Sequence, residues 1–152
     1  MKIKETKVNN HKKVIVAETS KRSLELPFSR LALRPTRQNK ISDIYVDPDL
    51  GYEGVTYVLE SGEEDTVHLD VFLDYNRDPD FLRTLFLYEL TVAAQDTMEK
   101  TELSKNEICR RLQTSPSQLA RLLDQTNHRK TVDKMLELLA VLGVSVKPSF
   151  AA

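Results

Sequence analysis

Residues 104–124, SKNEICRRLQTSPSQLARLLD, are the stretch that decides the fold of this chain. Ser104 and Ser115 are residue types that cap helix N-termini, and each is followed three residues later by Glu or Gln, the capping-box spacing. Pro116 suits the first turn of a helix. Apolar residues recur at one-turn steps in each half: Ile108 and Leu112, then Leu119 and Leu122. The pattern predicts two short helices joined by a tight turn, and both must pack on a scaffold because helices this short do not persist alone.

Charged residues are segregated along the chain, although the formal net charge of the 152 residues is only −1. Residues 1–40 hold 11 Lys and Arg against 3 Glu, whereas residues 41–80 hold one Arg against 12 acidic residues. Residues 103–130 hold 6 Lys and Arg against 2 acidic residues, and such a basic stretch suits phosphate binding. For residues 1–80 two interpretations stay open: the two blocks complement each other within the fold, or the acidic block docks a basic partner.

Length and composition limit the class of protein. Hydrophobic residues make up 40 % of the chain, enough for the core of one medium domain or two small ones. The single cysteine, Cys109, excludes an internal disulfide and favours a reducing compartment, where we expect it to be a buried thiol. No apolar run approaches the roughly 18 residues of a membrane span, and the basic start lacks the apolar core of a secretory signal. We therefore expect a cytoplasmic protein with no membrane contact.

The first half of the chain carries strand patterns. Residues 14–17 and 41–47 are short β-type runs. The clearest alternation has Val55, Tyr57 and Leu59 on one face and, after a turn at residues 61–64, Val67, Leu69 and Val71 on one face. The alternation predicts a hairpin with one buried face. We expect residues 1–78 to form a small antiparallel β domain.

At Asp78 the period changes to that of a helix, which we expect to run from Pro79 to about Lys100. This helix has two apolar stripes: Leu82, Phe86, Leu90 and Ala93 on one, Phe81, Leu85, Tyr88 and Val92 on the other. Because a surface helix needs only one stripe, two stripes predict coverage on both sides and a rigid junction. A last helix is expected from Thr131 to Gly143, with Leu136 among its core residues. The fold class is therefore α+β, an N-terminal antiparallel sheet part followed by a four- to five-helix bundle in residues 79–152.

Residues 103–146 resemble the phage-repressor and Cro-like (XRE-type) helix-turn-helix family. The matching apolar or small positions are Ile108, Cys109, Leu112, Thr114, Leu119 and Leu122, and the run LLAVLGVSV resembles the end of that domain. With the helix from residue 79 as the first of the bundle, the resemblance covers roughly residues 79–146. Two positions depart from the family: Lys105 stands where many members have Gln, and Gln113 stands where the turn often has Gly.

The resemblance implies that the second helix of the pair lies in the major groove of double-stranded DNA. Carried over by position, the DNA-binding residues are Lys105, Ser115, Ser117, Gln118, Arg121, Arg129 and Lys130. Three alternatives stay open: the Gln118 amide is used in capping, Arg121 pairs with Asp124 one turn away, or Lys105 is merely solvated. We expect Arg110 and Arg111 to be solvated.

The function expected from the resemblance is sequence-specific DNA binding as a transcriptional repressor that acts as a homodimer. Its predicted dimer surface is Leu138, Val141, Val144 and Val146, because these apolar residues lie off the core stripe or beyond the helix. The alternative is an antitoxin-like interaction module whose β part, residues 41–80, docks a basic partner protein. Catalysis, metals and cofactors are not expected, because His11, His68 and His128 are far apart and the chain has no phosphate-binding Gly loop.

Overall fold

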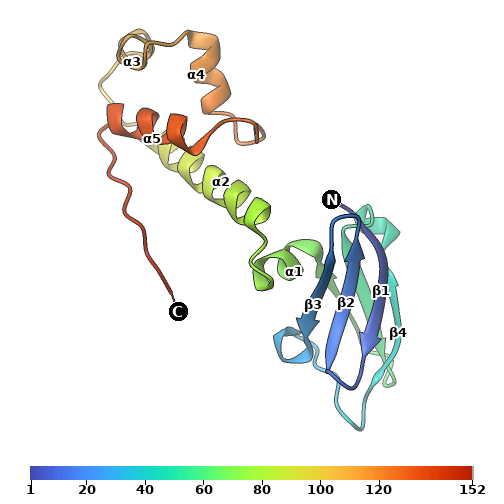
Figure 1. Ribbon diagram of the computed structural model, residues 1–152. Helices are drawn as coiled ribbons and strands as arrows, with labels where there is room; N and C mark the ends of the chain where they lie inside the picture. The colour runs from blue at the N-terminus through green and yellow to red at the C-terminus, as the bar shows by residue number, and fades with distance from the viewer. Residues whose placement is uncertain (152) are drawn as a thin grey trace. The chain divides into compact units, whose positions relative to one another are not determined.

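The computed structural model describes residues 1–151 and shows a mixed α+β chain with two three-stranded antiparallel sheets and five α-helices (Figure 1). The chain divides into two compact units, Met1–Phe81 and Leu82 onward, and each is described by itself. The expected order of a sheet part followed by helices is only partly right. The β residues form two sheets, and helical turns η1 (Phe28–Arg30) and η2 (Pro48–Leu50) lie between strands.

The first sheet has the order β1-β2-β3 and consists of β1 (Ile3–Asn9), β2 (Val14–Thr19) and β3 (Ser23–Pro27). Its pairings are antiparallel throughout, with Val16 opposite Lys7 on one side and opposite Glu25 on the other. The alternation along β3 decides its faces, because Leu24 and Leu26 are buried while their neighbours on the strand are not.

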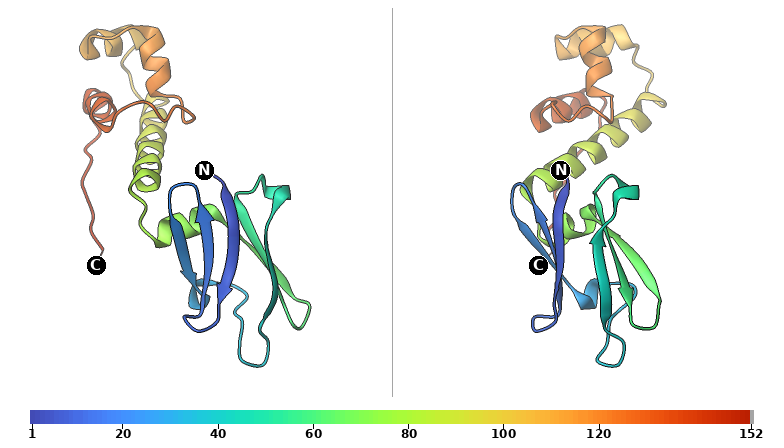
Figure 2. Two further views of the ribbon diagram at one scale, coloured as in Figure 1. Left: turned by 45° about the vertical axis from the view of Figure 1, so that its right-hand side comes forward. Right: turned by 90° about the vertical axis from the view of Figure 1, so that its right-hand side faces the viewer.

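The second sheet has the order β4-β5-β6 and consists of β4 (Ile41–Val46), β5 (Gly54–Leu59) and β6 (Glu64–His68). The predicted hairpin is present: Val55 pairs with Val67, and both side chains are buried. Side views show the two sheets face to face, with β1 beside β4 (Figure 2).

The core of this first unit lies between the sheets. Its largest fully buried side chains are Ile15, Leu24, Leu26, Tyr57, Leu59 and Phe72. Burial of each such side chain stabilises the fold by about 1.5–3 kcal/mol. The Tyr57 hydroxyl donates a hydrogen bond of 2.6 Å to the Leu33 carbonyl, so the polar atom is satisfied. Burial and the nearby Asp65 carboxylate raise the pKa of Tyr57 to about 12.

The predicted strand through Val71 is wrong beyond His68, where the chain turns into α1 (Leu69–Tyr75). The His68 Nδ1 atom accepts a hydrogen bond of 3.2 Å from the Asp70 N–H, which caps the helix. The helix buries Leu69, Phe72 and Leu73 and leaves Val71 exposed, a period of three to four residues. Three alternating apolar residues therefore did not suffice to distinguish a strand end from a first helical turn.

The long helix is α2 (Pro79–Met98), and Asp78 begins it as expected. Its Oδ2 atom accepts a hydrogen bond of 2.9 Å from the Phe81 N–H, and its Oδ1 atom lies 2.6 Å from the Arg22 guanidinium. The expectation of two covered stripes is wrong. The buried residues are Leu87, Leu90, Thr91 and Ala94, whereas Leu82, Leu85, Phe86 and Tyr88 are exposed. Within the second unit, one face of this helix is packed.

The stretch that opened the sequence folds into α3 (Lys105–Leu112) and α4 (Pro116–Leu122), and α5 (Val132–Val141) follows. The two predicted caps, Ser104 and Ser115, are present, and Thr131 caps α5 in the same way. The hydroxyl oxygens of Ser104, Ser115 and Thr131 accept hydrogen bonds from backbone N–H groups three residues ahead, at 3.1, 3.2 and 3.1 Å. Among residues 1–151 no helix combines the length and apolar character required to cross a membrane.

The core of the second unit joins these helices. Its fully buried members include Ile108 from α3, Leu119 from α4, and Met135, Leu138 and Leu139 from α5. Leu138 is 0 % exposed, so its assignment to a dimer surface is wrong, and Leu136, expected in the core, is 38 % exposed. Val141 and Val144 also pack against this core, which leaves only Val146 of the predicted surface exposed.

Gln113 ends α3 in the left-handed conformation, with φ 55° and ψ 47°. A side chain in this conformation costs about 1 kcal/mol relative to glycine. We therefore expect Gln113→Gly to raise the free energy of unfolding of the helical unit by about 0.5–1 kcal/mol. Urea denaturation followed by circular dichroism at 222 nm measures this change, and unchanged or lower stability would contradict the strain.

Candidate nucleic-acid interface

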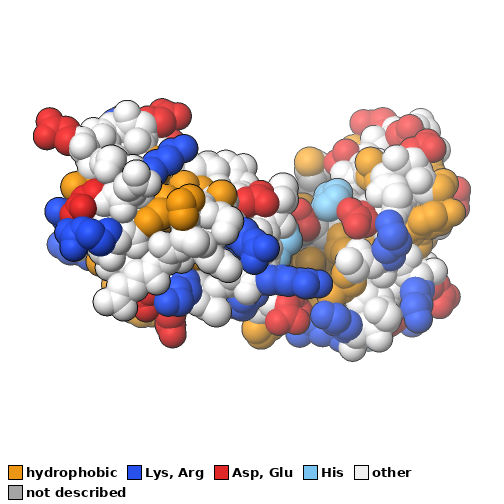
Figure 3. All heavy atoms as spheres, turned by 90° about the horizontal axis from the view of Figure 1, so that it is seen from above, with side chains coloured by type: hydrophobic (Ala, Val, Ile, Leu, Met, Phe, Trp, Pro, Cys, Tyr) orange, Lys and Arg blue, Asp and Glu red, His pale blue; other side chains and the backbone are white. Residues whose placement is uncertain are grey.

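The exposed face of α4 is the centre of the candidate interface. The cap at Ser115 and the proline at the first helical position begin the helix, and Leu119 fixes one face against the core. Gln118 and Arg121 are three residues apart and both side chains are exposed. Lys and Arg side chains stand among Asp, Glu and polar side chains on the left of Figure 3. The packing of α4 therefore presents an amide and a guanidinium together.

An open groove of about 840 Å³ lies beside α4 and contains Gln118 and Arg121 in its wall. The other walls are the α3–α4 turn, the loop of residues 124–131 and the first turns of α5. Its cationic residues are Arg121, Arg129, Lys130 and Lys134, and its acidic residues are Asp124 and Glu137. The groove therefore has an excess of positive charge within the described residues.

Arg121 does not pair with Asp124, which settles one of the alternatives. The Asp124 carboxylate instead accepts hydrogen bonds from the Thr126 N–H at 2.9 Å and the Thr126 hydroxyl at 2.7 Å. These bonds lower the pKa of Asp124. No carboxylate among residues 1–151 forms an ion pair with Arg121. Its guanidinium is available to an external acceptor.

The Gln118 side chain is not used in capping. Its backbone N–H donates to Ser115 Oγ at 3.2 Å, but the side-chain amide forms no hydrogen bond with any described residue. Ser115 Oγ also lies 3.1 Å from Ser117 Oγ, so these two hydroxyls are partly engaged with each other. The NH₂ donor and the oxygen acceptor of the Gln118 amide are thus both free to bind an external group.

Lys105 is exposed at the start of α3 and forms no ion pair in the described part of the chain. Arg110 and Arg111 are different, because both bind Glu107, with nitrogen–oxygen distances of 2.5 and 3.0 Å. Their hydrogen bonds lower the pKa of Glu107 to about 2. Glu107 is therefore held by two arginines, which stay exposed to solvent as expected.

Lys130 does not fit its predicted role as a DNA contact. It is 7 % exposed, and its Nζ atom donates to the backbone oxygens of Leu122 at 2.9 Å and Asp124 at 2.8 Å. Burial lowers the pKa of Lys130. The side chain ties the C-terminal end of α4 to the loop, where a cation also interacts favourably with the helix dipole. Its neighbour Arg129 is exposed and lines the groove.

The groove also contains residues that sequence reasoning missed. Asn127 Nδ2 donates a hydrogen bond of 3.1 Å to the Arg121 carbonyl, and Asn127 Oδ1 accepts a hydrogen bond of 3.1 Å from the Arg129 N–H. Lys134 lies in the first turn of α5 and reaches Glu137 at 3.2 Å. Its position three residues after the Thr131 cap is the signal that could have identified it. The loop is thus held by side-chain bonds to backbone.

Residues 1–151 contain no group of three or more His, Cys, Asp or Glu side chains placed to hold a metal ion. No protein-family model, curated protein or solved structure matches the chain. The resemblance to repressor-type helix-turn-helix proteins therefore rests on the residues of 103–146 and on the helix pair described above.

Proposed function

We propose that the chain is a sequence-specific double-stranded DNA-binding protein, a transcriptional repressor that acts as a homodimer. The observation that carries the proposal is the capped pair α3 and α4, whose second helix presents unpaired Gln118 and Arg121 side chains beside a basic groove. In this proposal α4 enters the major groove, α3 crosses the backbone, and α2 and α5 complete a repressor-like bundle.

The chemistry of the two side chains suits base reading. A guanidinium forms two parallel hydrogen bonds with the O6 and N7 atoms of guanine, and an amide does the same with adenine. In this proposal Ser115, Ser117, Lys105 and Arg129 contact phosphates, and such contacts position the protein without reading sequence. A helix as short as α4 covers few base pairs, so two copies on half-sites about one DNA turn apart supply the specificity.

The test is selection of DNA from a random pool by the purified full chain, followed by fluorescence anisotropy on the enriched duplex. We expect an enriched sequence with two related half-sites. Binding to the enriched duplex and to a scrambled one with equal affinity at physiological salt would contradict sequence-specific binding.

The salt dependence of this affinity tests the phosphate contacts separately. We expect Lys105→Ala to reduce the slope of log affinity against log salt concentration by about one unit, because one fewer counterion is released. Lys4→Ala, which removes an exposed lysine on β1, is the matched control and should leave the slope unchanged. Equal slopes for wild type and Lys105→Ala would exclude Lys105 from the interface.

A second function, docking of a basic partner protein on the first unit, is favoured by its unpaired carboxylates. Only two ion pairs join the basic residues 1–40 to the acidic residues 41–80: Lys21 with Asp80 at 3.6 Å and Arg22 with Asp78 at 2.6 Å. Exposed carboxylates at Asp43, Glu60 and Glu64 have no ion pair among the described residues. Co-purification of a stoichiometric basic protein, lost in Glu60→Lys with Glu64→Lys, would support this function.

A further inference from the structure

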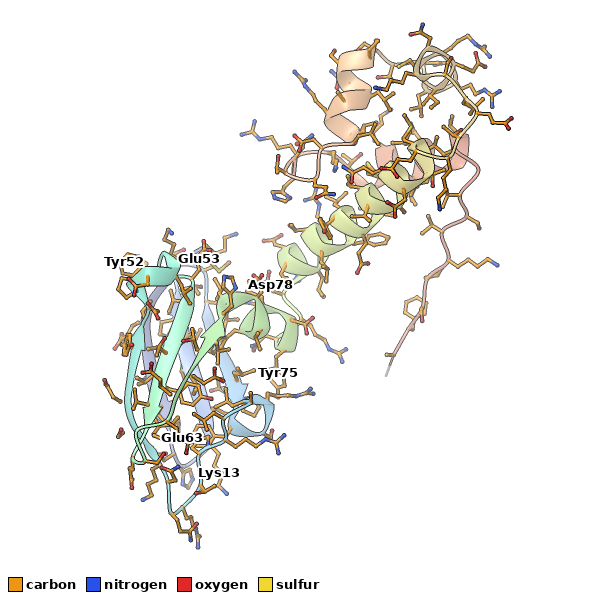
Figure 4. The ribbon with its side chains drawn as sticks, turned by 180° about the vertical axis from the view of Figure 1, so that it is seen from behind. Lys13, Tyr52, Glu53, Glu63, Tyr75 and Asp78 are labelled. Carbon is orange, nitrogen blue, oxygen red and sulfur yellow. The ribbon has the colours of Figure 1, made fainter. Side chains whose placement is uncertain are left out.

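A second pocket lies wholly within the first unit. It has a volume of about 460 Å³ and is formed by the β1–β2 turn, the start of η1 and the turn of residues 34–40. Four of its nine lining residues are cations, Lys13, Arg34, Arg37 and Lys40, and none is acidic. Lys13 lies at the end of the sheets opposite to Tyr52 and Glu53 (Figure 4). Glu63 lies at the same end as Lys13 but is not part of the lining.

No described carboxylate forms an ion pair with any of these four cations. Lys2, Lys4 and Arg30 also lack an ion pair, but only these four surround one pocket. Lys7, Lys12 and Arg22 each lie within 3.9 Å of a Glu or Asp oxygen. Four like charges around one concave surface produce a positive potential that attracts anions. The pocket therefore has the charge of a site for a polyanion.

Hydrogen bonds hold the turns that carry these cations. The Phe28 N–H donates a hydrogen bond of 2.9 Å to the Lys13 carbonyl, and this bond joins the β1–β2 turn to η1. Thr36 and Asn39 exchange backbone hydrogen bonds of 3.0 and 3.2 Å across the turn that carries Arg37. The Asn39 side chain in turn bonds Ser61, at 2.9 Å to its N–H and 3.1 Å to its hydroxyl. A pre-formed turn loses little freedom when a ligand binds.

We propose that this pocket binds a nucleoside di- or triphosphate. Its volume lies in the range of small-molecule sites, about 300–1,000 Å³. Two arginines and two lysines match several phosphate oxygens, and the guanidinium fork binds them in pairs. The half-buried side chains of Phe28 and Pro35 offer an apolar surface for the base, and Ser29 and Thr36 offer hydroxyls for the ribose. This ligand is independent of the DNA proposed for the second unit.

The experiment is isothermal titration calorimetry on the full chain, without DNA, with ATP, GTP and inorganic phosphate as probes. We expect a nucleoside triphosphate to bind at least about tenfold more tightly than phosphate. Arg34→Ala with Arg37→Ala should weaken that binding by about 100-fold, since each charge-assisted contact contributes about tenfold. The control pair Lys4→Ala with Lys7→Ala removes the same charge from β1 and should change affinity less than about threefold. Arg37→Gln alone, a smaller change to an exposed side chain, should weaken binding about tenfold.

Several results would overturn the proposal. One is that neither triphosphate produces binding heat at millimolar concentration. Another is that the pocket pair and the control pair lose the same triphosphate affinity, because this would mean unspecific charge attraction. Phosphate bound as tightly as the triphosphates would show a simple anion site. Loss of duplex DNA binding in the pocket pair with triphosphate binding intact would assign the cations to DNA phosphates. Circular dichroism confirms that each variant is folded.

Discussion

Arg121→Ala is expected to weaken binding by about 5- to 150-fold, or about 1–3 kcal/mol, at each half-site of the selected duplex, while binding to scrambled DNA changes little. The reason is the free guanidinium on α4, since Asp124, the only acidic residue one turn away, is held by Thr126. The loss should be confined to one base pair per half-site, because a bidentate contact reads one guanine. Fluorescence anisotropy on the selected duplex and on its single-base variants measures both effects.

Arg111→Ala is the matched control for this change. It removes the same charge from the neighbouring helix α3, but its guanidinium pairs with Glu107 at 3.0 Å and is not in the groove. Its affinity for the selected duplex should stay within about twofold of wild type, and any loss should be equal on all sequences. If Arg111→Ala and Arg121→Ala reduce affinity equally on selected and scrambled DNA, α4 does not read bases.

Leu138→Lys is expected to unfold the helical unit, with a loss of about 3–5 kcal/mol in the free energy of unfolding. Leu138 is 0 % exposed in the core of α3, α4 and α5, so the ammonium would be buried without a partner. Leu136→Lys, two residues earlier on the same helix and 38 % exposed, should change stability by less than about 0.5 kcal/mol. Urea denaturation followed at 222 nm compares the two variants.

Leu138→Lys and Leu136→Lys also distinguish a role of Leu138 in the folded core from a role in dimer formation. If Leu138 were part of a dimer surface, Leu138→Lys would leave a folded monomer by light scattering and a normal helical signal. A folded Leu138→Lys chain would therefore contradict the core position. A helical signal lost in Leu136→Lys as well would contradict the assignment of the exposed face of α5.

Local signals predicted the helices of the second unit well. Ser104, Ser115 and Thr131 cap helices because their side-chain oxygens satisfy backbone groups three residues away, an interaction contained in the local sequence. The end of α5 two residues before Gly143, whose φ is 78°, follows from the same kind of local chemistry. Alternation in the hairpin also predicted the burial of Val55, Tyr57 and Leu59 on β5 and of Val67 on β6, although Thr56 on β5 is buried as well.

The errors concern interactions between segments distant in sequence. The end of β6 at His68 depends on a helix that packs on β3. Lys130 is buried because the end of α4 and the following loop fold over it, and nothing in the letters RK distinguishes it from exposed Arg129. The apolar stripes of α2 did not indicate which of their side chains other residues bury. The basic pocket escaped notice because its cations come from residues 13, 34, 37 and 40, which the fold brings together.

The position of Cys109 has a consequence for labelling chemistry. It is the single cysteine of the chain, 6 % exposed, and packed in the core of the helical unit. A thiol reagent reaches it when the packing around α3 opens, locally or with the whole unit, so the modification rate reports on these openings. The same atom would take one fluorophore or spin label per chain, but at the expense of the packing around Ile108 and Leu119. A reporter cysteine for binding studies therefore belongs elsewhere, in a Cys109→Ala background.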